Sequence, residues 1–162
     1  MKLKLAKSTW GMEGPLEEQM HRMAEAGYQI IETGIPADRS PRELQKSLRE
    51  ANLDLILMIF TDGDDHVASL RTQVEQAQAY GPLFINAHSG RDFWSFARQR
   101  DFFAEALEVE RQAGIEINHE THRGRAFCNP WNAEALLKEF PELLFSLSCS
   151  FSPSLATRST VP

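Results

Sequence analysis

The stretch LDLILMIFT, residues 53–61, decides the fold class of this chain. Apart from Asp54 and the final Thr61, the run is apolar throughout. A strand with one solvated face alternates apolar and polar residues, whereas a strand covered on both faces is apolar at nearly every position. Residues 53–61 therefore predict a central strand of a parallel sheet, with helices packed against that sheet.

On both sides of this run, short apolar segments alternate with longer amphipathic ones. The clearest helix start is Ser40-Pro41-Arg42-Glu43, which has the pattern of a capping box with proline at the first helical position. The expected strands cover residues 1–7, 28–33, 53–61, 83–88, 115–121 and 143–148. The expected helices start at Pro15, after Ser40, near Asp64, at a cap formed by Asp92 or Asp101, and at Asn129-Pro130.

This order is a strand-helix unit repeated five times and followed by a sixth strand. Strands that alternate with helices pair in parallel through right-handed crossovers, so the chain is expected to be α/β. Periodicity alone does not distinguish a doubly wound sheet from part of a (β/α)₈ barrel. Neither GxGxxG nor GxxxxGK[ST] occurs, so a nucleotide-binding sheet gains no support.

Composition narrows the class of partner. The chain has 162 residues, of which 42% are hydrophobic and 25% are charged, so it can bury a core. Its net charge of −6 and the absence of a basic run argue against nucleic-acid and anionic-membrane partners. No apolar segment is long enough to span a membrane, and Cys128 and Cys149 form no CxxC pair. We therefore expect a cytoplasmic protein.

Several expected strands end in a chemically useful side chain. These residues are Trp10, Glu32, His88, Glu120 and His122. In parallel α/β folds the carboxyl ends of the strands meet at one edge, where binding sites form. A single glutamate or histidine there is also compatible with a solvated loop or a structural contact, so the cluster matters more than any one member.

The fifth expected strand carries the strongest signal. Its alternate residues Glu116, Asn118, Glu120 and His122 share one face, whereas His119 belongs to the apolar face. Glu120, His122 and Arg123 converge at the strand end, and a carboxylate with an imidazole can bind Zn²⁺, Mn²⁺ or Co²⁺. Arg123 and Arg125 could hold a phosphate or carboxylate of a substrate, or they could simply form an exposed basic loop.

The segment NHETHRGR, residues 118–125, resembles the xylose-isomerase-like TIM-barrel family. NPW at 129–131, EFP at 139–141, INAHSG at 85–90 and IETG at 31–34 add weaker matches. This group includes sugar-phosphate isomerases and epimerases and is related in fold to class-two apurinic endonucleases. The resemblance covers about residues 1–149 and selects the barrel from the two architectures.

The resemblance implies a barrel that uses a divalent metal (Mn, Mg, Co or Zn) to act on a small sugar or polyol. The chemistry implied is proton abstraction beside a carbonyl, with the metal stabilising the enediolate. Glu120 carries the role of metal ligand, and Glu120 and His88 are the candidate catalytic residues. The candidate substrate-binding residues are Trp10, Glu32, His122, Arg123 and Arg125.

The chain departs from the family pattern after the sixth strand. The family continues with an aspartate and, three residues later, a histidine, but this chain has Ser150 and Pro153. A complete (β/α)₈ barrel takes roughly 250 residues. We therefore expect an incomplete barrel over residues 1–149, with five strand-helix units and a sixth strand. Residues 150–162 are expected to be an atypical tail, disordered or produced by a frameshift.

Three hypotheses about function follow. The first is a metal-dependent sugar isomerase or epimerase that is impaired by the loss of later metal ligands. The second is an inactive barrel fragment or assembly partner that binds no metal and self-associates through the exposed sheet edges. The third is an endonuclease-like phosphodiesterase, which the acidic composition disfavours.

Overall fold

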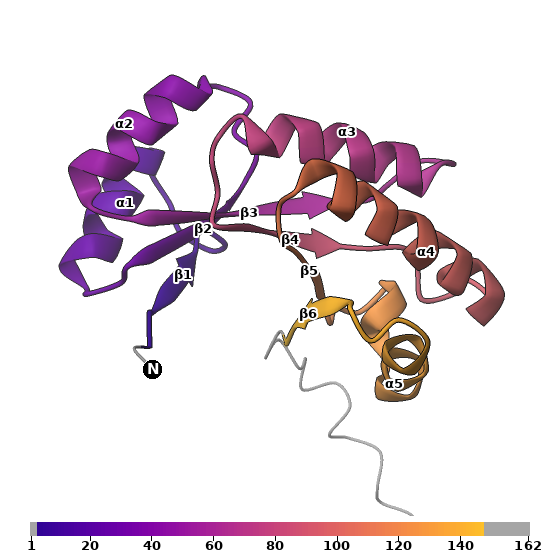
Figure 1. Cartoon of the computed structure of the whole chain (residues 1–162). Helices are drawn as coiled ribbons and strands as arrows, with labels where there is room; N and C mark the ends of the chain where they lie inside the picture. The colour runs from indigo at the N-terminus through magenta and orange to yellow at the C-terminus, as the bar shows by residue number, and fades with distance from the viewer. Residues whose placement is uncertain (1–2, 148–162) are drawn as a thin grey trace, which may run out of the picture.

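The computed structural model describes residues 3–147 of the chain. Within this part, parallel strands and α-helices alternate strictly along the sequence, as Figure 1 shows. The strands are β1 (Ala6–Ser8), β2 (Ile30–Gly34), β3 (Asp54–Phe60), β4 (Phe84–His88), β5 (Ile117–Glu120) and β6 (Leu144–Ser146). The helices are α1 (Leu16–Glu25), α2 (Pro41–Ala51), α3 (His66–Gln78), α4 (Phe96–Ala113) and α5 (Pro130–Glu139), with a short 3₁₀ turn at Ala126–Cys128.

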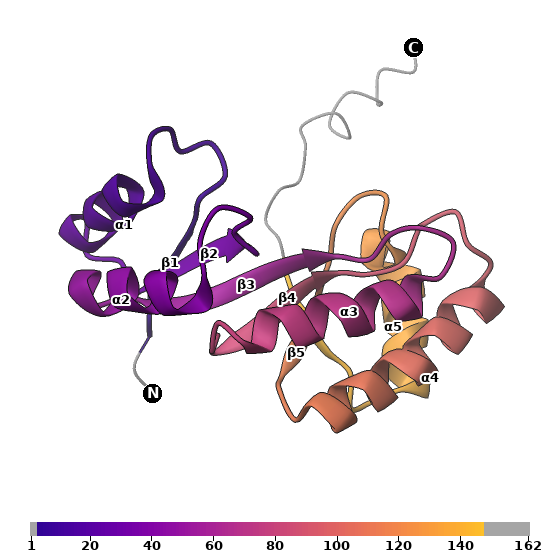
Figure 2. The same ribbon diagram turned by 90° about the horizontal axis from the view of Figure 1, so that it is seen from above.

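The strands form one sheet in the order of the sequence, and every neighbouring pair is parallel. The sheet curls, and the helices lie along its outer side (Figures 1 and 2). Sequential order, parallel pairing and an outer ring of helices define a (β/α)₈ barrel, of which the described residues make six strands. The prediction of an incomplete TIM barrel is confirmed.

The outer face of the sheet and the helices enclose the hydrophobic core. Alternate strand residues such as Ile31, Leu57 and Ile85 are fully buried there. They pack against helix residues that are equally inaccessible to solvent. The helix side of the core includes Met20, Met23, Leu44, Leu70, Val74, Phe103 and Leu136.

The inner face of the sheet carries the intervening residues, which are mostly apolar on β3 and include polar side chains on β2, β4 and β5. Register places Glu32 beside Ile56, and Met58 beside Asn86. Asn86 in turn pairs with Asn118 of β5. The central strand β3 is therefore apolar on both faces, as residues 53–61 predict, while β4 and β5 carry polar side chains inward.

Helix starts follow local capping chemistry. The capping box before α2 is present, because the Ser40 side chain accepts from the backbone of Glu43 and the Glu43 carboxylate accepts from the backbone of Ser40. The predicted cap of α4 is wrong. Neither Asp92 nor Asp101 fills that position, because the hydroxyl of Ser95 accepts from the backbone amide of Arg98.

The first strand also differs from its prediction. The alternation in residues 1–7 predicts a longer strand, but β1 covers only Ala6–Ser8. Its ladder with β2 runs from Ala6 opposite Ile30 to Ser8 opposite Glu32, and the carbonyl of Leu5 just before it accepts from the backbone of Gln29 and Ile30. The predicted tail over 150–162, with Ser150 and Pro153, lies outside the described residues. Within residues 3–147, no helix has the length and apolar character that a membrane crossing requires.

The core assignment can be tested with Leu57→Ala. Leu57 has no exposed surface, so truncation removes buried contacts and leaves a cavity. The free energy of unfolding should fall by about 2–5 kcal/mol. Leu83→Ala is the control, because Leu83 is 49% exposed just before β4. Urea denaturation measures both, and an equal loss in the two variants would contradict the assignment.

Candidate functional site

Two carboxylates meet on the inner face of the sheet, with an amide between them. The Nδ2 group of Asn86 donates to Oε1 of Glu32 at 2.9 Å and to Oε2 of Glu120 at 2.7 Å. Its Oδ1 accepts from the Ser146 hydroxyl at 2.6 Å. One amide on β4 therefore connects side chains from β2, β5 and β6.

Asn86 was not among the candidates from the sequence. Its residue type suggests no particular chemistry, and asparagine in a strand is usually taken as a neutral polar residue. One feature of the sequence does point to Asn86. It lies two residues before His88 on the same strand, so the two side chains share a face. Only the register of the neighbouring strands shows that both carboxylates reach its amide.

His88 lies at the carboxyl end of β4, buried beside the same carboxylates. Its Nε2 atom is 3.0 Å from Oε2 of Glu120. This contact lacks the direction of a hydrogen bond, and within residues 3–147 neither ring nitrogen of His88 has a hydrogen-bond partner. A buried imidazole with unused nitrogens is costly to desolvate, so it is well placed to bind a polar group of a ligand.

Aromatic rings line the rim next to His88. Phe60, the last residue of β3, stacks on the His88 ring at 4.3 Å between centroids. The His122 ring meets the His88 ring edge-on at 4.8 Å, and its Nδ1 contacts the carbonyl of Arg123. Trp10 is exposed, with its ring 6.4 Å from Phe60. The rim thus offers apolar ring faces beside two carboxylates.

The two candidate arginines occupy different environments. Arg123 is exposed. Arg125 is half-buried and donates to the carbonyl of Thr61 at 2.9 Å, and its guanidinium lies 5.8 Å from the centre of the Phe60 ring. Burial lowers the pKa of Arg125, and the charge of Arg91 adds to this effect. Arg125 therefore braces the loop after β3, and its role as a substrate contact stays a prediction.

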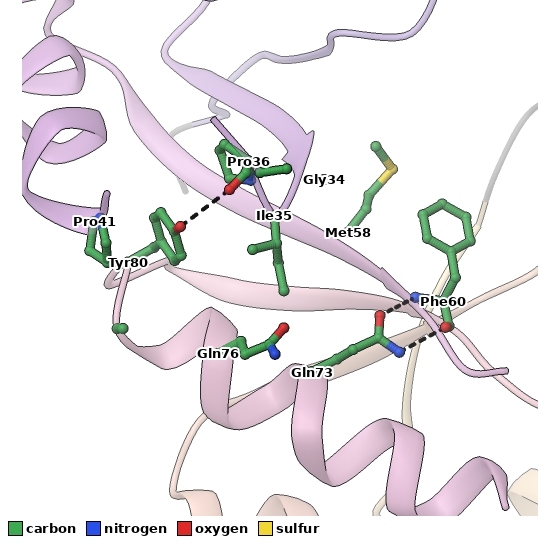
Figure 3. A pocket seen from close by; sticks show the side chains of 11 residues that line it. Gly34, Ile35, Pro36, Pro41, Met58, Phe60, Gln73, Gln76 and Tyr80 are labelled. Atoms are coloured by element: carbon green, nitrogen blue, oxygen red, sulfur yellow. Dashed lines mark hydrogen bonds between the residues drawn. The ribbon is translucent and has the colours of Figure 1, made fainter. Parts of the chain in front are cut away.

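A hollow of about 710 Å³ opens beside this rim, and Figure 3 shows its lining. Strand β2 ends at Gly34, opposite Met58, so β3 continues past it to Phe60. The hollow is bounded by the loop after β2 and by α3. On α3 the side-chain amide of Gln73 accepts from the backbone N–H of Phe60 and donates to its carbonyl oxygen. All the lining residues are uncharged. The hollow reaches Phe60, but neither Glu32 nor Glu120 lines it.

The donor set decides whether the described residues fit a divalent metal. His88 and Glu120 are close enough to act as two ligands, whereas Glu32 is held on the far side of the Asn86 amide. Within residues 3–147, no three His, Cys, Asp or Glu side chains are grouped to hold a metal ion. Protein zinc sites take three or four protein ligands, so the described residues do not complete a zinc site. The role of Glu120 as a metal ligand stays a prediction.

Solved structures with this fold extend the comparison. A sugar phosphate isomerase/epimerase from Parabacteroides distasonis matches with a TM-score of 0.70 and 17% identity, covering 89% of this chain and 64% of the other. An AP endonuclease of family 2 from Brucella melitensis gives 0.65 and 18%, covering 85% and 64%. The IOLI protein with a bound zinc atom gives 0.68 and 13%, covering 86% and 59%.

These comparisons confirm the predicted resemblance at the level of the fold. The chain spans about three fifths of the length of the structures it matches. Comparison by sequence finds no relative, because no family model and no curated protein matches the chain. Identities this low carry the barrel architecture, but they do not carry the activity of any neighbour.

A second network beneath the rim gives a pH-dependent prediction. The Thr61 hydroxyl contacts Nδ1 of His66 at 2.7 Å and accepts from the backbone of Gly90 at 2.9 Å. Burial lowers the pKa of His66, and the charge of Arg91 acts in the same direction. The neutral imidazole therefore stabilises the fold above about pH 6.5, and this contribution is lost as the pH falls through the lower folded-state pKa.

The urea midpoint of the protein should accordingly fall as the pH is lowered below about 6.5. In His66→Gln the urea midpoint should fall less steeply with pH, because glutamine does not titrate and the contribution of His66 is removed. Denaturation series at matched ionic strength measure the two slopes. Parallel curves for the two proteins would show that His66 makes no contribution.

Proposed function

We propose that this chain forms the proton-transfer half of a sugar or polyol isomerase or epimerase. The observation that carries the proposal is the single Asn86 amide bound to both Glu32 and Glu120, next to His88 and Glu120 at the carboxyl ends of β4 and β5. That edge is where (β/α)₈ barrels bind their substrates. The solved isomerase/epimerase structures of this fold support the same choice.

The side chains of the chain suffice to outline the proton transfer. Glu120 removes the proton from the carbon beside a carbonyl, and the electron pair moves onto the carbonyl oxygen to form an enediolate. The imidazole of His88 donates to that oxygen, since its ring nitrogens are not used within the described protein. In an epimerisation Glu32 starts protonated and gives its proton to the opposite face of the same carbon, while Glu120 keeps the proton that it removed. In an isomerisation Glu120 returns its proton to the adjacent carbon, and the hydroxyl on the first carbon passes its proton to the former carbonyl oxygen.

The rim residues then act in binding. Trp10 and the Phe60–His122 rings offer apolar faces on which the C–H face of a sugar can lie. The exposed Arg123, and the donors of Arg125 that remain beyond its two backbone contacts, would bind an anionic group of the substrate. A divalent metal, as in the zinc-bound neighbour, would require ligands in addition to His88 and Glu120.

Deuterium exchange tests the proposed chemistry even while the product is unidentified. The probes are D-fructose, L-ribulose and D-fructose 6-phosphate in D₂O, with and without Mn²⁺, followed by NMR at the carbons beside the carbonyl. Glu120→Gln and Glu32→Gln should each lower the exchange rate at least about 100-fold, the usual share of general acid–base catalysis.

Glu116→Gln is the matched control for this experiment. Glu116 precedes β5 at its opposite end and contacts Asn118, so its charge lies away from the Asn86 amide. Its exchange rate should equal that of the wild type. Two results would refute the proposed proton transfer. The wild type could exchange deuterium on all three probes no faster than a sample without protein, or Glu120→Gln could exchange it as fast as the wild type.

Assembly through a sheet edge is the second proposed function. Among residues 3–147, strand β6 borders the sheet, and residues 143–147 contain no charge. Leu144, Phe145 and Leu147 are exposed there, which is the pattern of an edge that pairs with another strand. The opposite edge carries Lys4 and Lys7, and pairing β1 with a second β1 would bring these charges together. We therefore propose self-association through β6.

The matched pair Leu147→Lys and Leu3→Lys tests this edge. Both leucines are 76% exposed, so neither substitution disturbs the core. Leu147→Lys places a charge beside β6 and should weaken self-association at least about tenfold, a cost of about 1.4 kcal/mol. Leu3→Lys lies at the β1 edge and should change it little. Sedimentation velocity over a concentration series measures both, and a monomeric wild type would exclude the dimer.

A further inference from the structure

Three polar side chains form a buried chain of hydrogen bonds on the outer side of the sheet. Nδ1 of His119 on β5 lies 2.7 Å from the hydroxyl of Ser89, and Nε2 of His119 lies 2.9 Å from Oε1 of Glu110 on α4. Ser89 is 1% exposed and His119 has no exposed surface. We call these three residues the Ser89–His119–Glu110 relay.

The partners fix the direction of the hydrogen bonds in the relay. An ionised carboxylate accepts only, so the Glu110 oxygen requires the imidazole proton on Nε2. In the neutral imidazole Nδ1 then has a lone pair and accepts from the hydroxyl of Ser89. Each polar group of the relay is therefore satisfied, and His119 is held as one tautomer by its two neighbours.

The surroundings of the relay are aromatic. The His119 ring meets Phe103 edge-on at 5.0 Å and stacks with Phe127 at 6.3 Å. Burying an imidazole, a hydroxyl and a carboxylate among such rings is costly unless all of them are bonded, and an apolar core would hold the sheet without that cost. The polar relay therefore needs a reason beyond stability.

The position of the relay in the sequence supplies that reason. Ser89 directly follows His88, and His119 directly precedes Glu120. Consecutive strand residues point to opposite faces, so the relay lies behind the two side chains that meet at 3.0 Å on the inner face. It connects the ends of β4 and β5 to each other and to α4.

We propose that the Ser89–His119–Glu110 relay is a positioning device that sets the distance and orientation between His88 and Glu120. This role rests on the proposed proton transfer, in which those two groups act on the same substrate. The order serine, histidine and acid is also that of hydrolase triads, but the Ser89 hydroxyl lies in the helix layer, where no substrate reaches it.

The sharpest test breaks the relay at its far end. Glu110→Leu removes the carboxylate on α4, on the other side of the sheet from His88, and Glu110→Gln retains an acceptor oxygen for Nε2. Glu105→Leu on the exposed side of the same helix is the matched control. The ring Cε1–H resonance of His88, assigned by its loss in His88→Gln, reports the position of the imidazole without any substrate.

In Glu110→Leu the His88 resonance should move and broaden, and kcat for deuterium exchange should fall about 10-fold to 100-fold with little change in KM. Glu110→Gln should restore both, and Glu105→Leu should alter neither. If Glu110→Leu does not fold, Ser89→Ala breaks the relay from the other end and is measured in the same way.

Two results would overturn the proposal. A lower melting temperature with an unchanged His88 resonance would mean that the relay only stabilises the fold. Labelling of Ser89 by a fluorophosphonate would mean that its hydroxyl is an accessible nucleophile. Should the wild type exchange deuterium with none of the probes, the proposed function fails, but the His88 resonance still decides whether the relay positions the imidazole.

Discussion

The register of β3, β4 and β5 is the constraint on which the rest of the structure depends. Side chains alternate between the two faces of a strand, so a slip of one residue would exchange the core for the site. With Met58 beside Asn86 and Asn86 beside Asn118, the branched residues Ile85 and Ile117 face the helices. The apolar outer face holds this register, and the polar inner face follows from it.

Polar groups on the inner face are tolerated because each is bonded to another. The Asn86 amide donates both of its N–H groups to Glu32 and Glu120, and its oxygen accepts from Ser146, so one amide satisfies an oxygen of each of two neighbouring carboxylates. The hydrogen bonds lower the cost of burying the charges. His88 is the exception in this group, because within residues 3–147 its ring nitrogens have no hydrogen-bond partner, and the proposed function assigns this free capacity to the substrate.

The sequence predicts the fold well because the strands and helices follow from patterns among residues that are close together in the sequence. The apolar run at 53–61 and the capping box at Ser40 need only neighbouring residues to be recognised. The Ser95 cap was overlooked because it lacks the acidic partner that makes a capping box visible. Register and distance are not local, and for that reason the bridging role of Asn86 and the bracing role of Arg125 emerge only when strands distant in sequence are placed side by side.

The two borders of the sheet are chemically unequal. Lysines stand along β1, where Lys4 pairs with Asp54, whereas the residues of β6 are uncharged. A protein that pairs through both edge strands can add copies without limit and form fibres, because each added copy exposes another unpaired edge strand. A protein that pairs through one edge strand only has no free pairing edge left once the first partner has bound. In the proposed self-association through β6, the lysines of β1 disfavour a second contact between copies, so that assembly would stop at a pair.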